Sequence, residues 1–200
     1  MSIFTLAISA FLGLSACTPV GVAVGVGTTA GVVIAEERSI NDAAIDTRIT
    51  VEIAEALFQT HIDDLFRPIT VDVVEGRVMM TGVVKSQELA DQAAEIAWKV
   101  DGVRQVYNDM QVGDDSLVDP ARDRWITTKL RSRVLADAGV LDVNYAFTTV
   151  AGVIHIIGIA QDQAEIDRVI GHASDIAQVR RIVNHVVLKT DPSRLLAADD

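Results

Sequence analysis

The sequence is poor in cysteine, in net positive charge and in the motifs of enzymes. Cys17 is its only cysteine, so an intramolecular disulfide is excluded. The formal net charge is −11 at pH 7, whereas a general nucleic-acid binder is expected to present a basic surface. Disulfide-stapled scaffolds and nucleic-acid-binding proteins are therefore not expected, and nucleic acid is not expected as a partner.

Patterns for catalysis or metal binding are also missing. No serine lies in a nucleophile elbow, and no glycine-rich loop ends in Gly-Lys-Ser or Gly-Lys-Thr. The four histidines are His61, His155, His172 and His185. No pair of them has the close spacing of a metal site, so we expect them at the surface or on strand faces. We expect no enzyme, no catalytic residue, no metal and no cofactor.

What the chain does contain is one pattern that occurs twice, at an offset of 76 residues. The pattern runs over the 37 positions from Gly76 to Val112 and recurs without a gap. The matched pairs are Gly76 with Gly152, Val78 with Ile154, Gly82 with Gly158, Asp91 with Asp167, Val103 with Val179, Val106 with Ile182, Asn108 with Asn184 and Val112 with Leu188. A repeat of this length indicates two copies of one structural module.

Hydrophobic periodicity predicts the same order of elements in both copies: helix, strand, strand, helix, strand. Helices are predicted where apolar residues recur at helical spacing, and strands where they alternate with period two. The first module is expected to have helices at 46–59 and 87–100 and strands at 69–73, 78–83 and 103–112. The second is expected to have helices at 122–136 and 163–173 and strands at 145–149, 153–159 and 179–188. The first two strands of each module form a hairpin.

The first helices match at an offset of 77 rather than 76. The one-residue slip therefore falls in the connection before each hairpin. The linker at 114–120 is only a few residues long, which favours packed or closely spaced modules.

The N-terminal region reads as a lipoprotein signal. An apolar run at 3–14 has the length of a signal-peptide core and is too short for a comfortable spanning helix. Leu14-Ser15-Ala16-Cys17 follows it and resembles the lipobox of bacterial lipoproteins, in which the cysteine is lipidated and becomes the mature N-terminus. The residue after the cysteine is Thr18, not the aspartate that marks inner-membrane retention in enterobacterial lipoproteins. We expect a lipidated Cys17 and sorting to the outer membrane.

Residues 18–35 carry no charge and are rich in Gly, Val, Ala and Thr. Two interpretations stay open for this segment. It is a tether between the lipid anchor and the folded modules, or it is a helix that packs closely through glycines four residues apart, such as Gly21 and Gly25.

The repeated module resembles the BON domain. The resemblance rests on the helix-strand-strand-helix-strand order, on glycine before and after the central strand, and on Val, Val and Asn at the start of the last strand, which Asn108 and Asn184 are expected to begin. Two such modules behind a lipobox are similar to the dual BON-domain outer-membrane lipoproteins of Gram-negative bacteria, over about residues 39–190 plus the signal region. The resemblance implies an α+β fold of two tandem modules, each a three-stranded mixed sheet covered on one face by two helices.

The resemblance also implies a function. It points to a non-enzymatic, periplasm-facing, lipid-anchored outer-membrane protein that supports envelope integrity and contacts an anionic phospholipid membrane through its second module. The alternative is an interaction or scaffolding module that binds an envelope protein partner through a sheet edge or an apolar patch. Lipid binding requires basic and aromatic residues on an exposed helix face, whereas partner binding requires a free edge or a patch.

The expected organisation follows from these observations. Residues 1–16 form a lipoprotein signal peptide, 17–38 the lipidated N-terminus and tether, 39–113 the first BON domain, 114–121 a linker, 122–190 the second BON domain and 191–200 a flexible C-terminal tail. Six repeated residues are expected to be structural: Gly76, Gly82, Asn108, Gly152, Gly158 and Asn184. The asparagines are expected to satisfy backbone groups at a strand end. The glycines after the central strands are expected where a side chain would meet the covering helix or the backbone bends.

The first helix of the second module is the expected lipid-binding element. The predicted contacts are Arg122, Trp125, Lys129 and Arg133. A rotation of 100° per residue places Ile126, Thr127, Leu130 and Val134 on one core-facing stripe. The bases Arg122, Lys129 and Arg133 lie on one flank of it with Trp125 beside them, a combination typical of interfacial helices.

Charge distinguishes the two modules. Residues 42–115 contain 6 basic and 15 acidic side chains, whereas residues 117–189 contain 9 and 8. The first helix of the first module has Arg48 as its only base, so only the second module is expected to bind anionic lipid. The alternative is that Trp125 packs against the first module and the bases form a solvated face.

Overall fold

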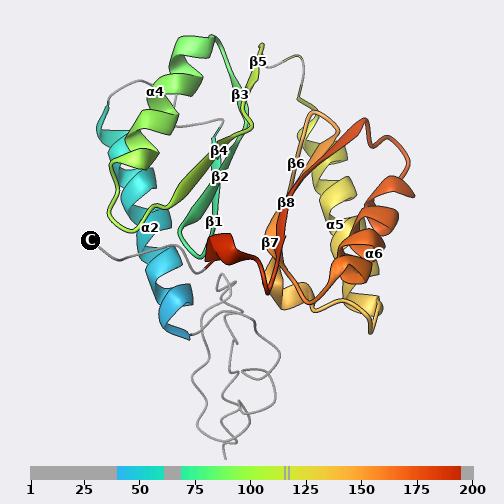
Figure 1. Cartoon of the computed structure of the whole chain (residues 1–200). Helices are drawn as coiled ribbons and strands as arrows, with labels where there is room; N and C mark the ends of the chain where they lie inside the picture. The colour runs from blue at the N-terminus through green and yellow to red at the C-terminus, as the bar shows by residue number, and fades with distance from the viewer. Residues whose placement is uncertain (1–39, 61–68, 115, 117, 195–200) are drawn as a thin grey trace, which may run out of the picture.

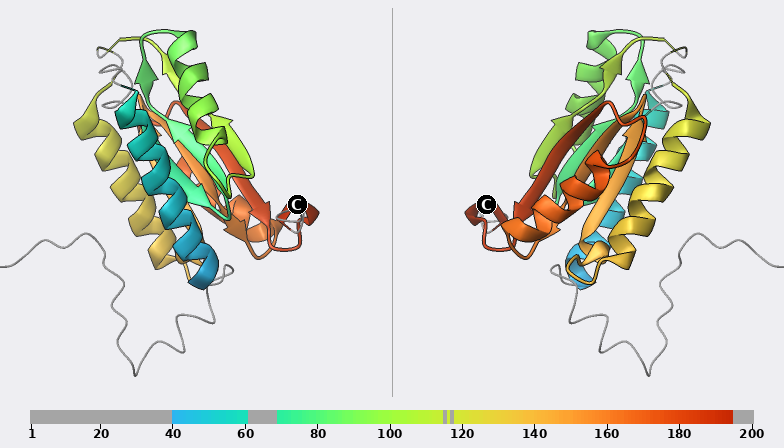
Figure 2. Two further views of the ribbon diagram at one scale, coloured as in Figure 1. Left: turned by 90° about the vertical axis from the view of Figure 1, so that its left-hand side faces the viewer. Right: turned by 90° about the vertical axis from the view of Figure 1, so that its right-hand side faces the viewer.

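The sheets of two small modules face each other at the centre of the molecule, and each sheet carries two helices on its outer side (Figure 1). This arrangement is seen in a computed structural model, which describes residues 40–60, 69–114, 116 and 118–194. From the two sides, Figure 2 shows α2 (Ile40–Gln59) and α4 (Gln87–Trp98) covering one face, and α5 (Pro120–Ala136) and α6 (Gln163–Ser174) covering the other. The α+β class and the tandem modules predicted from the sequence are confirmed.

The first module has a sheet that is interrupted near its end. Its strands are β1 (Thr70–Val74), β2 (Arg77–Thr81), β3 (Val83–Val84), β4 (Gln105–Asn108) and β5 (Gln111–Val112). β2 pairs antiparallel with β1 and parallel with β4, and β3 pairs parallel with β5. The last strand was expected to run through 103–112, but it is interrupted at Asp109 and Met110, between β4 and β5. Its neighbour is interrupted at the same level, because Gly82, with φ +149°, bends the chain between β2 and β3.

The second module has the same order without the break. Its strands are β6 (Tyr145–Val150), β7 (Val153–Ala160) and β8 (Arg181–Leu188), and a 3-10 turn, η2 (Asp142–Asn144), precedes β6. β7 pairs antiparallel with β6 and parallel with β8, so β6 is one edge of the sheet. The parallel pair requires a crossover, and α6 supplies it.

Each module has its own apolar core between its helices and its sheet. On α2 the core side chains are Ile49, Ile53 and Leu57, and on α5 they are Ile126, Leu130 and Val134. The three residues of α5 have no exposed surface, as the predicted stripe requires. They match those of α2 at the offset of 77, so the repeat preserves the contact between helix and sheet.

A buried aspartate on the first helix holds each hairpin turn. Asp46 accepts backbone hydrogen bonds from Glu75 (2.8 Å) and Gly76 (2.9 Å), and Asp123 accepts the equivalent pair at 2.7 and 2.9 Å. Both residues of each turn have positive φ, as in a type I′ turn, whose outward N–H groups need an acceptor. Asp46 and Asp123 are 77 residues apart, the same offset as the core residues of the two helices, so the helix offset in the sequence is the signal that relates them.

The inner faces of the two sheets form a third apolar cluster. It joins Val74 and Met79 of the first module to Ile157 and Ile159 of the second, all nearly or completely buried. Sheets that would otherwise expose these residues are thus packed face to face. The modules are one body rather than two separate beads.

Equivalent positions of the two modules meet across this interface. Thr148 Oγ1 donates to Asp72 Oδ2 at 2.8 Å, and His185 Nε2 lies 2.8 Å from Asp109 Oδ2; each pair is 76 residues apart. Contact between a residue and its own equivalent occurs near a two-fold axis. The interface therefore resembles that of a symmetric dimer whose two copies are joined in one chain.

The chain beyond β8 clasps the first module. A 3-10 turn, η3 (Pro192–Arg194), carries Arg194, whose guanidinium pairs with both carboxylate oxygens of Glu75 at 2.7 and 2.9 Å. Arg104 donates to the carbonyls of Ser193 and Arg194 at 2.8 and 3.0 Å. The prediction of a flexible tail from residue 191 therefore does not hold for η3, because side chains of the first module bind it.

Candidate membrane-contact surface

The element predicted to bind lipid, α5, lies on the outer face of the second module. Asp119 caps its first turn by accepting from the N–H of Arg122, and Pro120 occupies the first position of the helix. Because the stripe of Ile126, Leu130 and Val134 is fully buried, the opposite side of the helix is turned to solvent. The sequence thus forms a helix with one anchored face and one free face.

Trp125 and Lys129 lie on that free face, one helical turn apart. Trp125 is 48% exposed, and Lys129 is exposed. Among the described residues, Trp125 is not a member of the apolar cluster between the two modules. An exposed Trp beside an exposed Lys can place an aromatic ring and a cation at the same level of an interface.

The other two predicted lipid contacts, Arg122 and Arg133, interact with other groups of the protein. Arg133 donates through Nη1 to the carbonyl of His172 at 3.0 Å, which ties α5 to the end of α6. Arg122 Nε lies 3.5 Å from Asp123 Oδ1, beside the aspartate that holds the hairpin. Both arginines are half-buried. The structure therefore leaves Trp125 and Lys129 as the accessible members of the predicted set.

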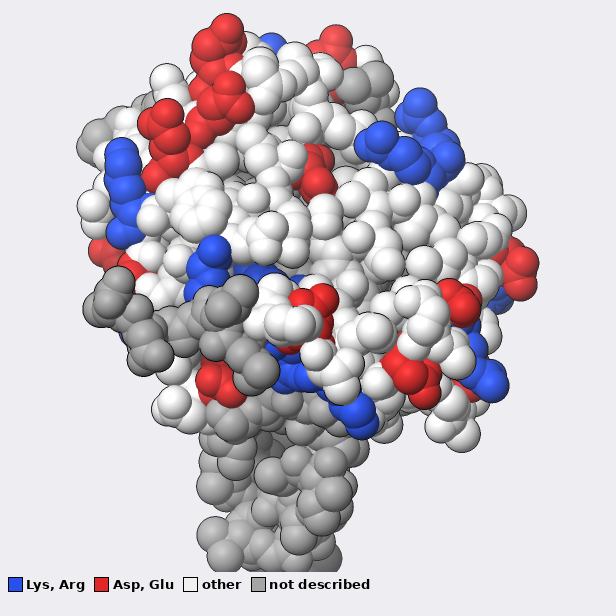
Figure 3. Space-filling view, in the orientation of Figure 1, with Lys and Arg blue, Asp and Glu red and all other residues white. Residues whose placement is uncertain are grey.

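The first helix of the first module, α2, offers no equivalent basic surface. Arg48 on α2 is paired with Glu52 at 2.9 Å and donates to the carbonyl of Asp101 at 3.1 Å. Exposed Glu88, Asp91 and Glu95 lie on α4, and Figure 3 shows acidic side chains gathered over that helix. An anionic membrane would be repelled from this side of the molecule.

The repeated asparagines satisfy backbone groups. Asn108 donates from Nδ2 to the carbonyl of Ala90 at 3.2 Å, and its Oδ1 accepts from the N–H of Met110 at 3.4 Å. Asn184 Oδ1 accepts from the N–H of Val186 at 3.1 Å. Asn108 lies at the end of β4 and Asn184 within β8, so neither begins its strand.

The repeated glycines lie where a side chain does not fit. Gly76 and Gly152 have φ of +69° and +76° in the hairpin turns, and Gly82 has φ +149° at the bend after β2. A Cβ on Gly158 would lie 2.6 Å from the carbonyl oxygen of Asn144. A side chain at Gly158 would therefore meet the backbone and ring at the start of β6, not the covering helix that was expected from the sequence.

An Asp between two histidines joins the modules, and the sequence did not reveal it. Asp109 Oδ2 lies 2.9 Å from Nδ1 of His155 on β7 and 2.8 Å from Nε2 of His185 on β8. Tyr107 stacks on the ring of His185 with 3.9 Å between ring centroids. His155 is a strand-face residue as expected, but it is only 1% exposed because the first module covers it.

These contacts control the charge of Asp109. Burial alone would raise the pKa of its carboxyl group, but the hydrogen bonds to His155 and His185 and their charges hold the pKa well below its usual range. Arg77 adds a second polar link, since its guanidinium donates to the carbonyls of Gly158 (3.1 Å) and His185 (3.2 Å). The cluster is a structural joint between modules.

Two negative findings hold for the described residues. Among them, no group of three or more His, Cys, Asp or Glu side chains could hold a metal ion. No helix in the described ranges is long and apolar enough to cross a membrane. Cys17, His61, the predicted signal peptide and the predicted tether lie outside the described residues.

Fold and surface together define a tandem-module α+β protein with an exposed aromatic and basic helix on its second module. The chain belongs to the BON domain family, whose model matches residues 41–114 and 122–190. The match includes both copies of the repeat, as the resemblance implied.

Three known proteins have sequences similar to this chain over part of its length. The chain is 40% identical over 124 residues to an uncharacterized protein in the gshII 5′ region of Anaplasma centrale, covering 61% of this chain and 80% of that protein. It is 31% identical over 91 residues to the outer membrane lipoprotein DolP of Haemophilus influenzae, covering 44% and 47%. It is 30% identical over 125 residues to the osmotically-inducible protein Y of Escherichia coli, covering 61% and 62%. The chain thus spans less than two thirds of the length of the latter two.

Proposed function

We propose that this protein is a non-enzymatic, periplasm-facing outer-membrane lipoprotein that supports envelope integrity and binds anionic phospholipid through α5. One observation carries the lipid proposal: Trp125 is 48% exposed, beside the exposed Lys129, on a helix whose opposite face is fully buried. Membership of the BON family and similarity to a protein named outer membrane lipoprotein DolP support the envelope assignment.

The proposed mode of binding follows from the side chains of α5. The helix lies along the membrane surface, with the ring of Trp125 in the headgroup layer and the ammonium group of Lys129 at a lipid phosphate. Arg133 and Arg122 are held by His172 and Asp123, so they hold the helix in place and add positive potential. The acidic surface of α4 keeps the first module away from the lipid.

A vesicle flotation assay tests this mode. Protein lacking residues 1–17, and therefore the lipid anchor, is mixed with vesicles of phosphatidylglycerol in phosphatidylcholine and centrifuged through a sucrose gradient. The parent is expected to float, and Trp125→Ala combined with Lys129→Glu is expected to stay at the bottom. Both residues are exposed, so the variant should keep the circular dichroism spectrum and melting temperature of the parent.

The first module offers a matched control. Trp98 is 52% exposed on α4 and is followed by the exposed Lys99. Trp98→Ala with Lys99→Glu removes the same ring and changes the charge by the same amount, and it should float like the parent. If the two double variants float equally well or equally poorly, α5 is not the specific lipid-binding element.

Lipid anchoring at Cys17 stays a prediction, because this residue lies outside the described ranges. It rests on Leu14-Ser15-Ala16-Cys17 after the apolar run. Mass spectrometry of the membrane fraction should find an acylated N-terminal Cys17, and Cys17→Ala should release the protein or leave the uncleaved precursor. An unmodified peptide with Ser15, Ala16 and Cys17 still joined would contradict the anchor.

A further inference from the structure

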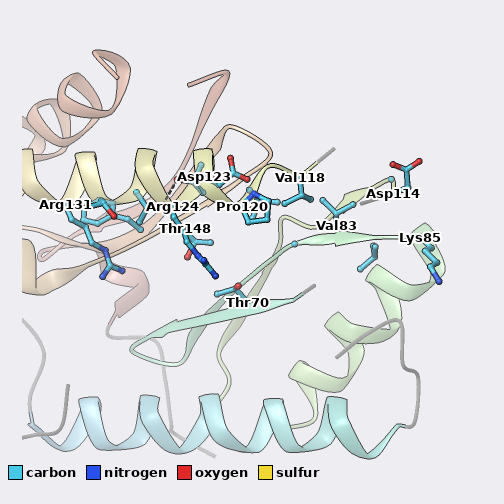
Figure 4. Close-up of a pocket in the computed structure, with 18 residues that line it drawn as sticks. Thr70, Val83, Lys85, Asp114, Val118, Pro120, Asp123, Arg124, Arg131 and Thr148 are labelled. Carbon is cyan, nitrogen blue, oxygen red and sulfur yellow. Dashed lines mark hydrogen bonds between the residues drawn. The ribbon is translucent and has the colours of Figure 1, made fainter. Parts of the chain in front are cut away.

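A groove of about 1080 Å³ separates the other flank of α5 from the first module (Figure 4). Its walls are α5, the edge strand β6, β3 and the linker that follows β5, and Thr70 of β1 lies opposite the helix. This volume lies just above the range of roughly 300–1,000 Å³ that is typical of ligand sites. Trp125 and Lys129 do not line it, so the groove is distinct from the proposed lipid surface.

One wall of the groove is an unpaired strand edge. Among the residues that the structure describes, β6 pairs only with β7, and Val150 lies opposite Val153 across a two-residue turn. In such a hairpin the residues next to the turn, and every second residue beyond, bond to the partner strand. Phe147 and Thr149 therefore direct their backbone N–H and C=O groups away from β7. Both residues line the groove, so another strand can pair there.

A second wall of the groove carries exposed positive charge. Arg124 and Arg131 are exposed residues of α5 that line the groove, and in Figure 4 both extend into the space between the helix and β1. Within the described part of the chain, neither arginine forms a hydrogen bond or a salt bridge. Burial raises the pKa of Asp72, and the positive charge of Arg131 partly opposes that rise, so Arg131 already interacts with one carboxyl group of the first module. In a protein of net charge −11, two exposed arginines beside a strand edge favour an acidic ligand.

Successive side chains of β6 point alternately toward α5 and toward the first module. The hydroxyl of Thr149 faces α5, where it lies 2.7 Å from that of Thr127, whereas Thr148 faces the first module and bonds to Asp72. A strand added to β6 would alternate in the same way. Its side chains on one face would lie beside Arg124 and Arg131, and those on the other face beside the first module.

We propose that the groove binds an extended acidic segment of a protein partner, which adds as a strand to the edge of β6. Backbone hydrogen bonds to Phe147 and Thr149 supply affinity, and acidic side chains at alternate positions pair with Arg124 and Arg131. The two arginines are about 10.5 Å apart along the helix axis. Residues on one face of a strand recur about every 6.8 Å, and the length of the arginine side chains spans the difference.

Fluorescence anisotropy with a labelled peptide of alternating Val and Glu tests the proposal on the protein lacking residues 1–17. The parent should bind this peptide with a dissociation constant below about 1 mM and should not bind a peptide of alternating Val and Lys. Arg124→Glu with Arg131→Glu should weaken binding at least about tenfold, because charge-assisted hydrogen bonds are replaced by repulsion. Trp125→Ala with Lys129→Glu, on the lipid flank, should bind the peptide like the parent.

A backbone probe separates strand addition from charge attraction alone. The same Val-Glu peptide with N-methyl groups on alternate residues cannot donate along one edge, and one of its two methylation registers should lose binding. Amide hydrogen exchange at Phe147 and Thr149 should slow when the unmodified peptide is bound.

Three outcomes overturn the proposal. The first is that the parent does not bind the acidic peptide. The second is that the Arg124→Glu, Arg131→Glu variant binds it as tightly as the parent does. The third is that the parent binds the two N-methylated peptides equally well. If the arginine variant fails in vesicle flotation while the parent ignores the peptide, the groove belongs to the lipid surface instead. Flotation failure of the Trp125→Ala, Lys129→Glu variant with intact peptide binding supports two separate sites.

Discussion

At the residue scale, the repeat places glycine in both modules at positions where an added Cβ atom would clash with neighbouring atoms or where φ is positive. Gly158 lies inside β7, where a Cβ would come within 2.6 Å of the Asn144 carbonyl oxygen and 2.9 Å of the Tyr145 ring. Distances this short force the backbone of the neighbouring strand to move. Gly171, on α6, is the opposite case, since a Cβ there would meet nothing within 4 Å.

Replacing Gly158 by Val is therefore expected to destabilise the protein by about 1 to 3 kcal/mol, the usual cost of overpacking. Gly82→Val should have a similar cost, because φ of +149° strains a β-branched residue. Gly171→Ala is the control and should stabilise by about 0.5 to 1 kcal/mol, since alanine favours the helix. Urea unfolding measures all three. A Gly158→Val midpoint equal to that of the parent would mean that β7 and the Asn144 backbone are not in contact.

At the element scale, α5 shows how one helix can serve different purposes on each side. Its buried stripe builds the core, one flank presents Trp125 and Lys129, and the other presents Arg124 and Arg131 to the groove. Its counterpart α2 has the same buried stripe, but its arginine is neutralised by Glu52. The repeat thus preserves the fold of the element while its exposed faces have diverged.

Lipid binding by α5 is expected to depend on salt. The Debye length falls from about 10 Å at 0.1 M to about 3 Å at 1 M, so the attraction between Lys129 and lipid phosphate weakens over this range. The fraction of parent protein that floats should fall as salt rises, with a remainder due to Trp125. Salt-independent flotation would show that apolar insertion alone accounts for binding.

At the scale of the whole molecule, polar contacts join two faces that are otherwise apolar. Asp109 bridges His155 and His185, while the salt bridge of Glu75 with Arg194 clasps the far end of the interface. The hydrogen bonds to the two histidines keep the pKa of Asp109 low. The Asp109 carboxylate therefore binds a proton less readily in the folded state than in the unfolded chain, and the free energy of unfolding is expected to fall in acid.

The sign of this response follows from linkage. Because the pKa of Asp109 is lower in the folded state, its stabilisation is present above the unfolded value of about 3.9 and is lost as pH falls toward the folded value. Asp109→Asn should remove this contribution, so its free energy of unfolding should fall less steeply than that of the parent below about pH 4. Urea titrations from pH 6 to about 2.5 measure the slope.

An exposed aspartate provides the comparison for Asp109. The side chain of Asp101 is 97% exposed, and Asp101→Asn should keep the slope of the parent. Equal slopes for the parent and Asp109→Asn would contradict a role for the histidine contacts in acid stability.

The sequence alone determined the order of elements, the repeat and the core stripe of α5. These depend on local rules: helical or alternate spacing of apolar residues, and glycines where φ is positive. Such rules act over a few residues, and each prediction is supported a second time because the same pattern recurs 76 residues later. The same reasoning placed Trp125 outside the core stripe without any knowledge of its neighbours.

Only the tertiary structure decided which exposed side chains are free and how the modules meet. Arg133 appeared available on a helical projection, but α6 brings the carbonyl of His172 within 3.0 Å of it. Asp109 lies 46 residues from His155 and 76 from His185, and their contact exists because two sheet faces bury against each other. The groove likewise arises from walls of both modules. Periodicity shows which face of an element is apolar, but the packing of distant segments determines what covers that face.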